Sequence, residues 1–310
     1  MLAWDAKTAR VMTLTCRLLS SSSAAAATAA RPRRSALYIP GSNLRALEKA
    51  KTLAADVLLL DLEDAVAPEN KGLARRQVAE AVRSGEYGRR ELVVRVNAWE
   101  SEWGREDVRV LAGGPPCTLL LPKAERVESV AGVVGSIGWE RVPVWCMIET
   151  PMGVLQAATL AAHPAVDCLV AGTNDLAADL RCDGAWAERA ALLPHLSQIV
   201  LAARAHGTAC LDGVHIDLSD DAGFERSCAQ GRALGFDGKT LIHPKTLGVA
   251  NRAFTPSPAE VEHARRVVAA FEAAAAAGSA LVVLDGRLVE ELHVRMAKRL
   301  LALSEAIGAA

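Results

Sequence analysis

Two acidic residues follow apolar segments and could bind one metal ion. Glu149 comes directly after VWCMI at 144–148, and Asp175 closes the run GTND at 172–175. An unpaired carboxylate in apolar surroundings costs on the order of several kcal/mol, so either a basic side chain or a cation must neutralise Glu149. Two carboxylates, with the other ligands left to water and substrate, are typical of Mg²⁺. We therefore predict a site for Mg²⁺, or alternatively Mn²⁺, at Glu149 and Asp175.

A basic residue, Arg95, follows the apolar pair Val93-Val94. A guanidinium in that position is desolvated and needs an anion. A fixed salt bridge to Glu63 or Asp64 and a contact with substrate are both open, and both can hold. We assign Arg95 to catalysis and substrate binding. The other predicted substrate-binding residues are Glu63, Asp64, Gly172, Thr173 and Asn174.

A second group of residues could bind the phosphates of a cofactor. Ser42, Asn43 and Arg45 stand at the start of a predicted helix, where backbone N–H groups and a cationic side chain favour anions. The same Ser-Asn pair is also an ordinary N-cap. His243, before Pro244, either contacts the cofactor or only turns the chain. We predict that Ser42, Asn43, Arg45, His243 and Pro244 bind a cofactor that carries phosphates.

The elements that must position these residues are eight short β-rich runs, each followed by a longer segment. The predicted strands are 36–40, 57–63, 92–97, 118–123, 142–149, 168–172, 208–214 and 238–243. Near-continuous apolar strands that alternate with helices indicate a parallel sheet with its outer face covered. No strand leads into G-x-G-x-x-G, which argues against a doubly wound dinucleotide-binding sheet. We predict a (β/α)₈ TIM barrel, whose chemistry would lie at the carboxyl ends of the strands.

Helical patterns separate the strands and continue beyond them. The predicted helices between the strands are 44–53, 71–83, 125–134, 151–162, 187–206 and 224–234; the third unit is the least regular, because 104–114 is a poor helix. After PSP at 256–258, the sequence predicts a helix over 259–277, a strand over 280–284, a turn at Asp285-Gly286 and a last helix. We therefore divide the chain into residues 1–34, a barrel over 35–255 and a C-terminal helical segment over 256–310.

Composition narrows the class of protein. The net charge is −1 with no long run of one sign, so no nucleic-acid partner is indicated, and the apolar stretches are too short to predict a membrane span. The seven cysteines include no C-x-x-C pair. Residues 1–34 are rich in Arg and Ser, and Asp5 is their only acid, which is typical of an organellar transit peptide. We expect import into the mitochondrion, with the plastid as an alternative. If residues 1–34 are not a targeting peptide, the cytoplasm is the expected location.

Several motifs together resemble one enzyme family. They are LYIPGS at 37–42, LDLEDAV at 60–66, VRVN at 94–97, LPK at 121–123, IET at 148–150, GTNDL at 172–176, and Gly238-Lys239 with Ile242-His243-Pro244. In this order they resemble the citrate lyase β-subunit-like family, within the HpcH/HpaI aldolase/citrate lyase superfamily. That family includes malyl-CoA and citramalyl-CoA lyases.

The resemblance implies Mg²⁺ at Glu149 and Asp175, a substrate-binding Arg95, and a trimer or a dimer of trimers. It also makes coenzyme A, as part of the substrate, the cofactor that we expect Ser42, Asn43, Arg45, His243 and Pro244 to bind. It also implies that the C-terminal segment of one subunit caps the site of its neighbour and supplies a catalytic Asp. Here that motif reads DGRLVE at 285–290, so Glu290 replaces the Asp. Glu keeps the carboxylate but adds one methylene, and we predict that Glu290 acts as the catalytic base.

These features predict a carbon–carbon lyase that cleaves citramalyl-CoA to acetyl-CoA and pyruvate, or malyl-CoA to acetyl-CoA and glyoxylate. Citramalyl-CoA is preferred because the chain resembles organellar members of the family. Two alternatives are open. A pyruvate-type aldolase on free hydroxy-oxo acids would share the barrel and the metal, and the exchange at Glu290 would also suit a catalytically silent CoA-binding relative.

Overall fold

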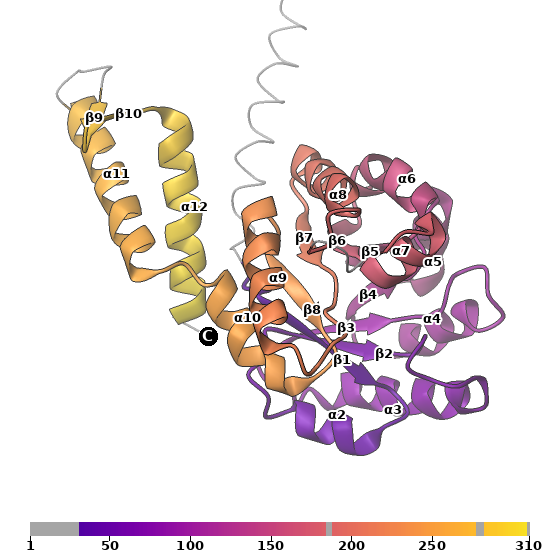
Figure 1. Cartoon of the computed structure of the whole chain (residues 1–310). Coiled ribbons are helices and arrows are strands. Elements are labelled where there is room, and N and C mark those ends of the chain that lie inside the picture. Colours follow the sequence, from indigo (N-terminus) through magenta and orange to yellow (C-terminus); the bar gives the residue numbers. More distant parts are fainter. Residues whose placement is uncertain (1–30, 184–187, 277–281, 309–310) are drawn as a thin grey trace, which may run out of the picture. The chain divides into compact units, whose positions relative to one another are not determined.

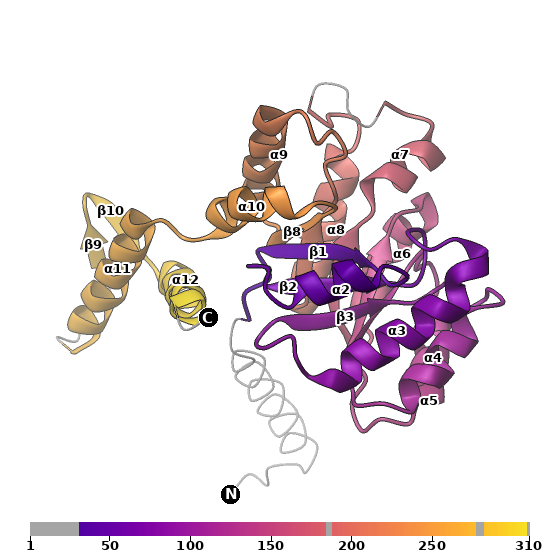
Figure 2. The ribbon, with the colours of Figure 1, turned by 90° about the horizontal axis from the view of Figure 1, so that it is seen from below.

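The computed structural model describes residues 31–183, 188–276 and 282–308. Two compact units share these residues: one spans Arg33–Phe254, and the other contains the segment from Thr255 onward. The helices and strands of both units are labelled in Figure 1, and Figure 2 shows the same ribbon from below. Most of the predicted leader lies outside the described residues.

The larger unit is a closed barrel of eight parallel strands. In chain order these are β1 (Ser35–Pro40), β2 (Val57–Asp61), β3 (Glu91–Arg95), β4 (Thr118–Leu121), β5 (Val144–Ile148), β6 (Val166–Ala171), β7 (Ala209–Asp212) and β8 (Gly238–Leu241). Each strand pairs with the next, and β1 pairs with β8, with Ala36 opposite Thr240. The predicted (β/α)₈ fold is confirmed.

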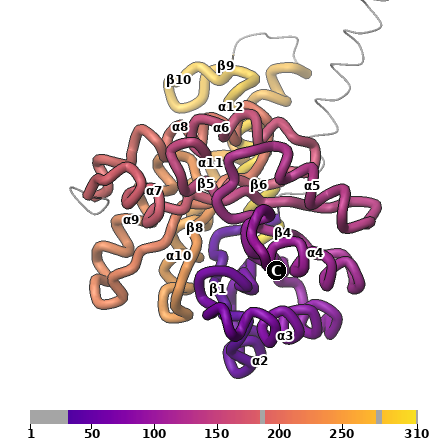
Figure 3. The backbone as a smooth tube through the Cα atoms, turned by 90° about the vertical axis from the view of Figure 1, so that its right-hand side faces the viewer, coloured from indigo at the N-terminus to yellow at the C-terminus, as the bar shows by residue number. Residues whose placement is uncertain are grey.

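Helices surround the strands, as the tube view shows (Figure 3). They are α2 (Leu44–Ala50), α3 (Lys71–Ser84), α4 (Gly104–Ala112), α5 (Val127–Ile137), α6 (Pro151–Ala161), α7 (Thr173–Leu180), α8 (Leu193–His206), α9 (Asp221–Leu234) and α10 (Leu247–Phe254), with 3₁₀ turns η2 (Pro68–Asn70) and η3 (Pro244–Thr246). The structure differs from the predicted pattern most at four helices. The segment 104–114 contains a regular helix, α7 and α10 were not predicted, and α8 begins at Leu193 instead of 187.

Strand side chains alternate between two apolar layers. Leu59, Leu120 and Trp145 pack inside the barrel, whereas Leu58 and Leu60 belong to the larger layer between strands and helices. All five residues are completely buried. Because both faces of a parallel barrel are covered, its strands carry apolar residues without polar alternation. The strands therefore form a rigid scaffold whose carboxyl ends can hold side chains in fixed positions.

Arg33 and Arg34, which we predicted to belong to the leader, bind the amino end of the barrel. Arg33 forms two hydrogen bonds of 2.8 Å to the carboxylate of Glu91, and its guanidinium lies 4.8 Å from the ring centroid of Trp145. Arg34 pairs with Asp56, with Nη2 and Oδ1 2.7 Å apart. The barrel unit thus begins at Arg33, two residues before the predicted boundary.

The C-terminal segment has its own small core. It comprises α11 (Pro258–Ala276), β9 (Val282–Leu284), β10 (Arg287–Val289) and α12 (Glu291–Gly308). Strands β9 and β10 form an antiparallel pair. The turn between them has left-handed backbone angles, with φ of 50° at Asp285 and 75° at Gly286. The predicted order of helix, strand, turn and helix is confirmed for the described residues, among which no helix is long and apolar enough to cross a membrane.

Candidate active site

Arg95 lies at the carboxyl end of β3, inside a cluster of carboxylates. The register of β2 and β3 places it opposite Asp61, and its Nε and Nη2 donate to the two oxygens of Asp61 at 2.7 and 2.6 Å. Nη1 lies 2.8 Å from Glu63 Oε2 and 3.2 Å from Asp64 Oδ2. Burial opposes the charge, but the hydrogen bonds and charge of Asp61 raise the pKa of Arg95 above its usual value.

The salt bridges considered for Arg95 are therefore present, together with one that the sequence did not single out. Asp61 stands in the LDLEDAV motif, and no role was predicted for it. It is completely buried, and it also accepts hydrogen bonds from the backbone N–H groups of Glu63 and Ala65. Four carboxylate contacts occupy the guanidinium. Three of these contacts are hydrogen bonds, and an Arg carries five N–H donors, so the guanidinium keeps N–H groups for a substrate.

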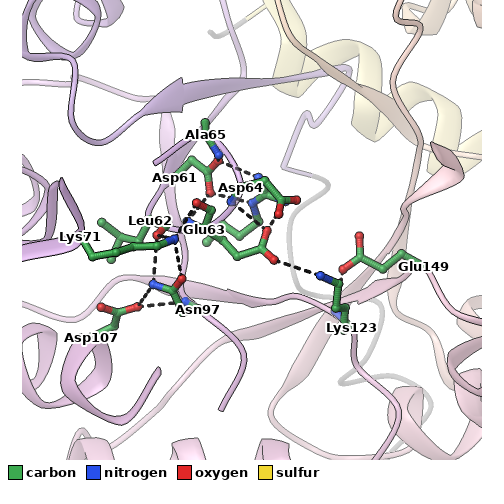
Figure 4. Close-up of polar contacts among 11 residues, drawn as sticks. Asp61, Leu62, Glu63, Asp64, Ala65, Lys71, Asn97, Asp107, Lys123 and Glu149 are labelled. Atoms are coloured by element: carbon green, nitrogen blue, oxygen red, sulfur yellow. Dashed lines mark hydrogen bonds and ion pairs between the residues drawn. The ribbon is translucent and has the colours of Figure 1, made fainter. Parts of the chain in front are cut away.

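Glu63 bridges two cations at the mouth of the barrel. It is 8% exposed, and besides its contact with Arg95, its Oε1 lies 3.6 Å from Lys123 Nζ (Figure 4). Burial raises the pKa of Glu63 to about 7, and neighbouring Asp64 adds to the rise, while Arg95 and Lys123 oppose it. Burial thus makes the Glu63 carboxylate easier to protonate than an exposed glutamate.

Glu149 follows β5 and is 2% exposed. Its Oε1 accepts a hydrogen bond of 2.7 Å from the backbone N–H of Lys123, a residue with a left-handed φ of 47°. A Cβ at Gly172 would lie 2.3 Å from the Cβ of Glu149, so only glycine at 172 leaves room for this carboxylate. Burial raises the pKa of Glu149 to about 8, and the charges of Glu63 and Asp175 contribute.

Asp175 lies in the first turn of α7 and is exposed. Its charge acts on both Glu149 and Lys123, so Asp175 is near enough to Glu149 for their charges to interact, and their binding of one metal ion stays a prediction. In the described part of the chain, no three His, Cys, Asp or Glu residues are grouped as metal ligands. The arrangement nonetheless fits Mg²⁺, which uses few protein carboxylates and keeps several waters. The buried, uncompensated charge of Glu149 is what a bound cation would neutralise.

The residues predicted to bind coenzyme A have local roles in the structure. Asn43 caps α2, because its side chain accepts a hydrogen bond from the N–H of Ala46 at 3.0 Å. His243 Nδ1 accepts one from the N–H of Lys245 at 3.1 Å, where the chain turns into η3. Arg45 is exposed. These contacts agree with the capping and turning alternatives, and coenzyme A binding stays a prediction.

Sequence reasoning missed two buried polar networks beside the site. In one, Lys239 Nζ and Arg189 Nη1 donate to the two oxygens of Asp212 at 2.7 and 2.8 Å. In the other, Lys71 and Asn97 bind the backbone of the turn that carries Glu63. The sequence did carry a signal for both networks. Asp212 and Asn97 stand at the ends of predicted strands, and Lys71 stands at the start of a predicted helix.

Glu290, the predicted base, belongs to the C-terminal unit. It is exposed and directly precedes α12. Its backbone N–H donates to His293 Nδ1 at 3.0 Å, and its carbonyl accepts from the N–H groups of His293 and Val294. The carboxylate is therefore carried on an ordered helix start.

A closed parallel barrel with charged residues at its carboxyl ends defines an enzyme of the (β/α)₈ class. Residues 34–244 match the model of the HpcH/HpaI aldolase/citrate lyase family. The chain belongs to this family, as its motifs predicted.

Three similar proteins show the range of the family. A (3S)-malyl-CoA thioesterase of Cereibacter sphaeroides is 48% identical, over 90% of this chain and 97% of its own. An L-malyl-CoA/β-methylmalyl-CoA lyase of the same species is 35% identical, over 90% and 97%. The CitE protein of Mycobacterium tuberculosis, solved with magnesium, acetoacetate and coenzyme A, is 31% identical, covers 89% of this chain and 99% of its own, and has a TM-score of 0.74.

Proposed function

We propose that this chain cleaves the carbon–carbon bond of a 3-hydroxyacyl-CoA that carries a carboxylate on its hydroxyl-bearing carbon. The site offers Glu149, a buried carboxylate with no cationic side chain against it in the described contacts, near enough to Arg95 for their charges to interact. That pairing suits a substrate that brings a metal ion and an anionic oxygen together. The relatives named for malyl-CoA and the CitE protein solved with magnesium and coenzyme A support this assignment.

The reaction follows from the chemistry of this substrate. Loss of the hydroxyl proton lets the oxygen electrons form a carbonyl, the adjacent carbon–carbon bond breaks, and its electrons pass to the thioester as an enolate. The enolate then takes a proton to give acetyl-CoA, and a 2-oxo acid is released. A magnesium ion held by Glu149 and Asp175 would supply Lewis-acid polarisation of the substrate oxygens. Glu290 takes the hydroxyl proton, and a free N–H of Arg95 binds the developing oxyanion.

The preferred substrates are citramalyl-CoA and malyl-CoA. They differ by one methyl group, which a pocket distinguishes by only about 1–3 kcal/mol. The organellar resemblance favours citramalyl-CoA, whereas the named relatives favour malyl-CoA. Both substrates therefore belong in the first assay.

A second function, hydrolysis of the malyl-CoA thioester, is favoured by one finding. The relative that is 48% identical is named a thioesterase, while the malyl-CoA lyase is 35% identical. Hydrolysis would add water to the thioester carbonyl and release free coenzyme A and malate. The acidic mouth of the barrel could serve either outcome, because both begin with deprotonation of an oxygen near a cation.

The products distinguish these functions. The purified chain with Mg²⁺ is incubated with each thioester, and acetyl-CoA, 2-oxo acid and free thiol are measured. A lyase gives acetyl-CoA and oxo acid in equal amounts with no thiol, whereas a thioesterase gives thiol and hydroxy acid. Turnover of free hydroxy-oxo acids alone would indicate the aldolase alternative. Binding of coenzyme A without turnover would indicate a silent relative.

We further propose that the active form is a homotrimer, or a dimer of trimers, and that residues preceding the barrel direct it to the mitochondrion. The composition of the leader supports import. Because Arg33 and Arg34 bind the barrel, the targeting signal should end before them. A fluorescent reporter fused after residue 32 that stays in the cytoplasm would contradict this localisation.

A further inference from the structure

Lys71, the first residue of α3, is a buried cation whose donors are all engaged. Its side chain is 7% exposed. Nζ donates to the carbonyl oxygens of Leu62 at 2.8 Å and Glu63 at 2.7 Å, and to Asn97 Oδ1 at 2.7 Å. An ammonium group has three N–H donors, so none is left for a substrate. Lys71 therefore acts on its neighbours within the protein.

A second layer holds this arrangement in place. Asn97 Nδ2 donates to the Leu62 carbonyl at 3.0 Å and to Asp107 Oδ2 at 2.6 Å. Asp107, on α4, is 1% exposed and also accepts a hydrogen bond of 2.7 Å from Arg75 Nε on α3. Figure 4 shows Lys71, Asn97 and Asp107 meeting beside the 61–65 turn. The network thus links that turn to two helices and to the end of β3.

Lys71 binds the turn through the backbone of Leu62 and Glu63. From this backbone the Glu63 carboxylate reaches Arg95 Nη1 on one side and Lys123 Nζ on the other. Lys123 in turn donates its N–H to Glu149. The contacts therefore run without a break from Lys71 through Glu63 and Lys123 to the predicted metal ligand. A shift of the turn would therefore disturb the positions of Arg95, Lys123 and Glu149.

We propose that Lys71 is a positioning residue of the active site, which fixes the Glu63 backbone and thereby aligns Arg95, Lys123 and Glu149. The expected effect on catalysis rests on the proposed function, whereas the expected effect on metal affinity rests only on the observed contacts. Partners beyond the direct ligands of a metal site change affinity or activity by about 10–100-fold when removed. Lys71 should have an effect of this size.

The test compares Lys71→Met with Lys49→Met, which replaces an exposed lysine on α2 that the site does not use. With the substrate turned over by the wild-type chain, Lys71→Met should lower kcat/KM about 10–100-fold, mainly through kcat. Mn²⁺ affinity, followed by electron paramagnetic resonance, should fall about tenfold. Lys49→Met should match the wild type in both readouts. Circular dichroism reports whether each variant is folded.

A smaller side chain separates positioning from a purely structural role. Lys71→Ala leaves space for a small cation, so added methylammonium should restore part of its activity and Mn²⁺ affinity. A folded Lys71→Met protein with normal kcat/KM and normal Mn²⁺ affinity would overturn the proposal. So would an Ala variant that is stabilised by methylammonium but gains no activity and no Mn²⁺ affinity.

The Mn²⁺ readout distinguishes the two proposals. If the wild-type chain turns over none of the thioesters, the proposed function fails. The loss of Mn²⁺ affinity in Lys71→Met, and its recovery with methylammonium in the Ala variant, still decide the role of Lys71. If both Lys71 variants are unfolded, Lys71→Gln takes their place, because it keeps a polar side chain but is too short to bind both carbonyl oxygens. It must lower Mn²⁺ affinity while folded, or the proposal is wrong.

Discussion

Glu149 is deeply buried, and few groups around it stabilise the negative charge of its carboxylate. It is 2% exposed, and its hydrogen bond from the Lys123 backbone lowers its pKa less than burial raises it. Ionisation of such a group is costly unless a cation arrives. In the absence of metal the carboxyl therefore holds its proton up to about pH 8. Metal binding and loss of this proton must then occur together.

Mg²⁺ affinity should consequently depend on pH. Because the pKa of Glu149 is raised, the proton competes with the metal below about 8. Affinity should therefore rise about tenfold per pH unit up to that point and level off above it. Calorimetry in buffers of different ionisation enthalpy should detect release of about one proton per Mg²⁺ near pH 6.5 and almost none near pH 9. An affinity that does not change with pH would contradict this account.

The variant Glu63→Gln tests why the pKa of Glu149 is raised. Glu63 raises the pKa of Glu149 through its charge, so Glu63→Gln should move the midpoint of the affinity curve to lower pH without abolishing it. Glu149→Gln should remove the pH dependence together with most of the affinity. An unchanged midpoint in Glu63→Gln would show that the charge of Glu63 does not contribute to the raised pKa of Glu149.

At the residue scale, the sequence indicated which residue types gather but not all of their pairings. Arg95 was predicted beside Glu63 and Asp64, yet its two shortest contacts are with Asp61. Three acids within four positions look equivalent in a sequence, and only the register of β2 and β3 selects Asp61. Lys71 was missed for a similar reason. A lysine that opens a helix normally lies in solvent, and its burial depends on α4 and β3.

At the scale of elements, the strands were predicted well because an apolar run between turns is a strong local signal. The helices were less certain. The predicted helix over 187–206 begins at Leu193 in the structure, where Pro194 occupies its first turn. Proline favours that position and could have set the boundary. Glu188 and Arg189, placed inside the predicted helix, have left-handed φ values of 59° and 69°. Their side chains instead bind Arg226 and Asp212.

The amino end of the barrel gives a stability prediction at this scale. Arg33→Met should destabilise the barrel by roughly 3 kcal/mol, because it leaves Glu91 inside the barrel end without its bidentate partner. This loss would lower Tm by about 6–12 °C. The double variant Arg33→Met with Glu91→Leu should regain much of the stability, since an apolar pair replaces the buried ion pair. Thermal unfolding followed by circular dichroism measures both.

The same contacts predict where a leader can be removed. A chain that begins at residue 33 keeps both arginines and should unfold at the temperature of the full-length protein. A chain that begins at residue 35 loses Arg33 and Arg34 together and should resemble Arg33→Met or be less stable. Equal Tm values for the two truncated chains would show that these ion pairs contribute little.

At the scale of the whole molecule, the C-terminal unit carries apolar side chains that its own core does not cover. Its core contains Val267, Val289 and Val294. Leu288 is 51% exposed, Leu292 43% and Met296 65%. Leu292 and Met296 are four residues apart on α12 and therefore lie along one face of that helix, while Leu288 lies on β10. An apolar face on so small a unit is typical of a surface that binds another protein, which agrees with the proposed capping of a neighbouring subunit.

If Glu290 serves the barrel of a neighbouring subunit, two inactive variants should complement each other. Glu149→Gln lacks the metal ligand and Glu290→Ala lacks the base, so each homo-oligomer should be almost inactive, while Glu290→Ala still binds Mn²⁺. In an oligomer reassembled from equal amounts, a site is complete when its barrel comes from one variant and its cap from the other. Random assembly gives about one quarter of the wild-type activity, measured after light scattering confirms the assembly. No recovery in mixed oligomers would mean that Glu290 serves its own barrel, and full activity of Glu290→Ala alone would remove it from the mechanism.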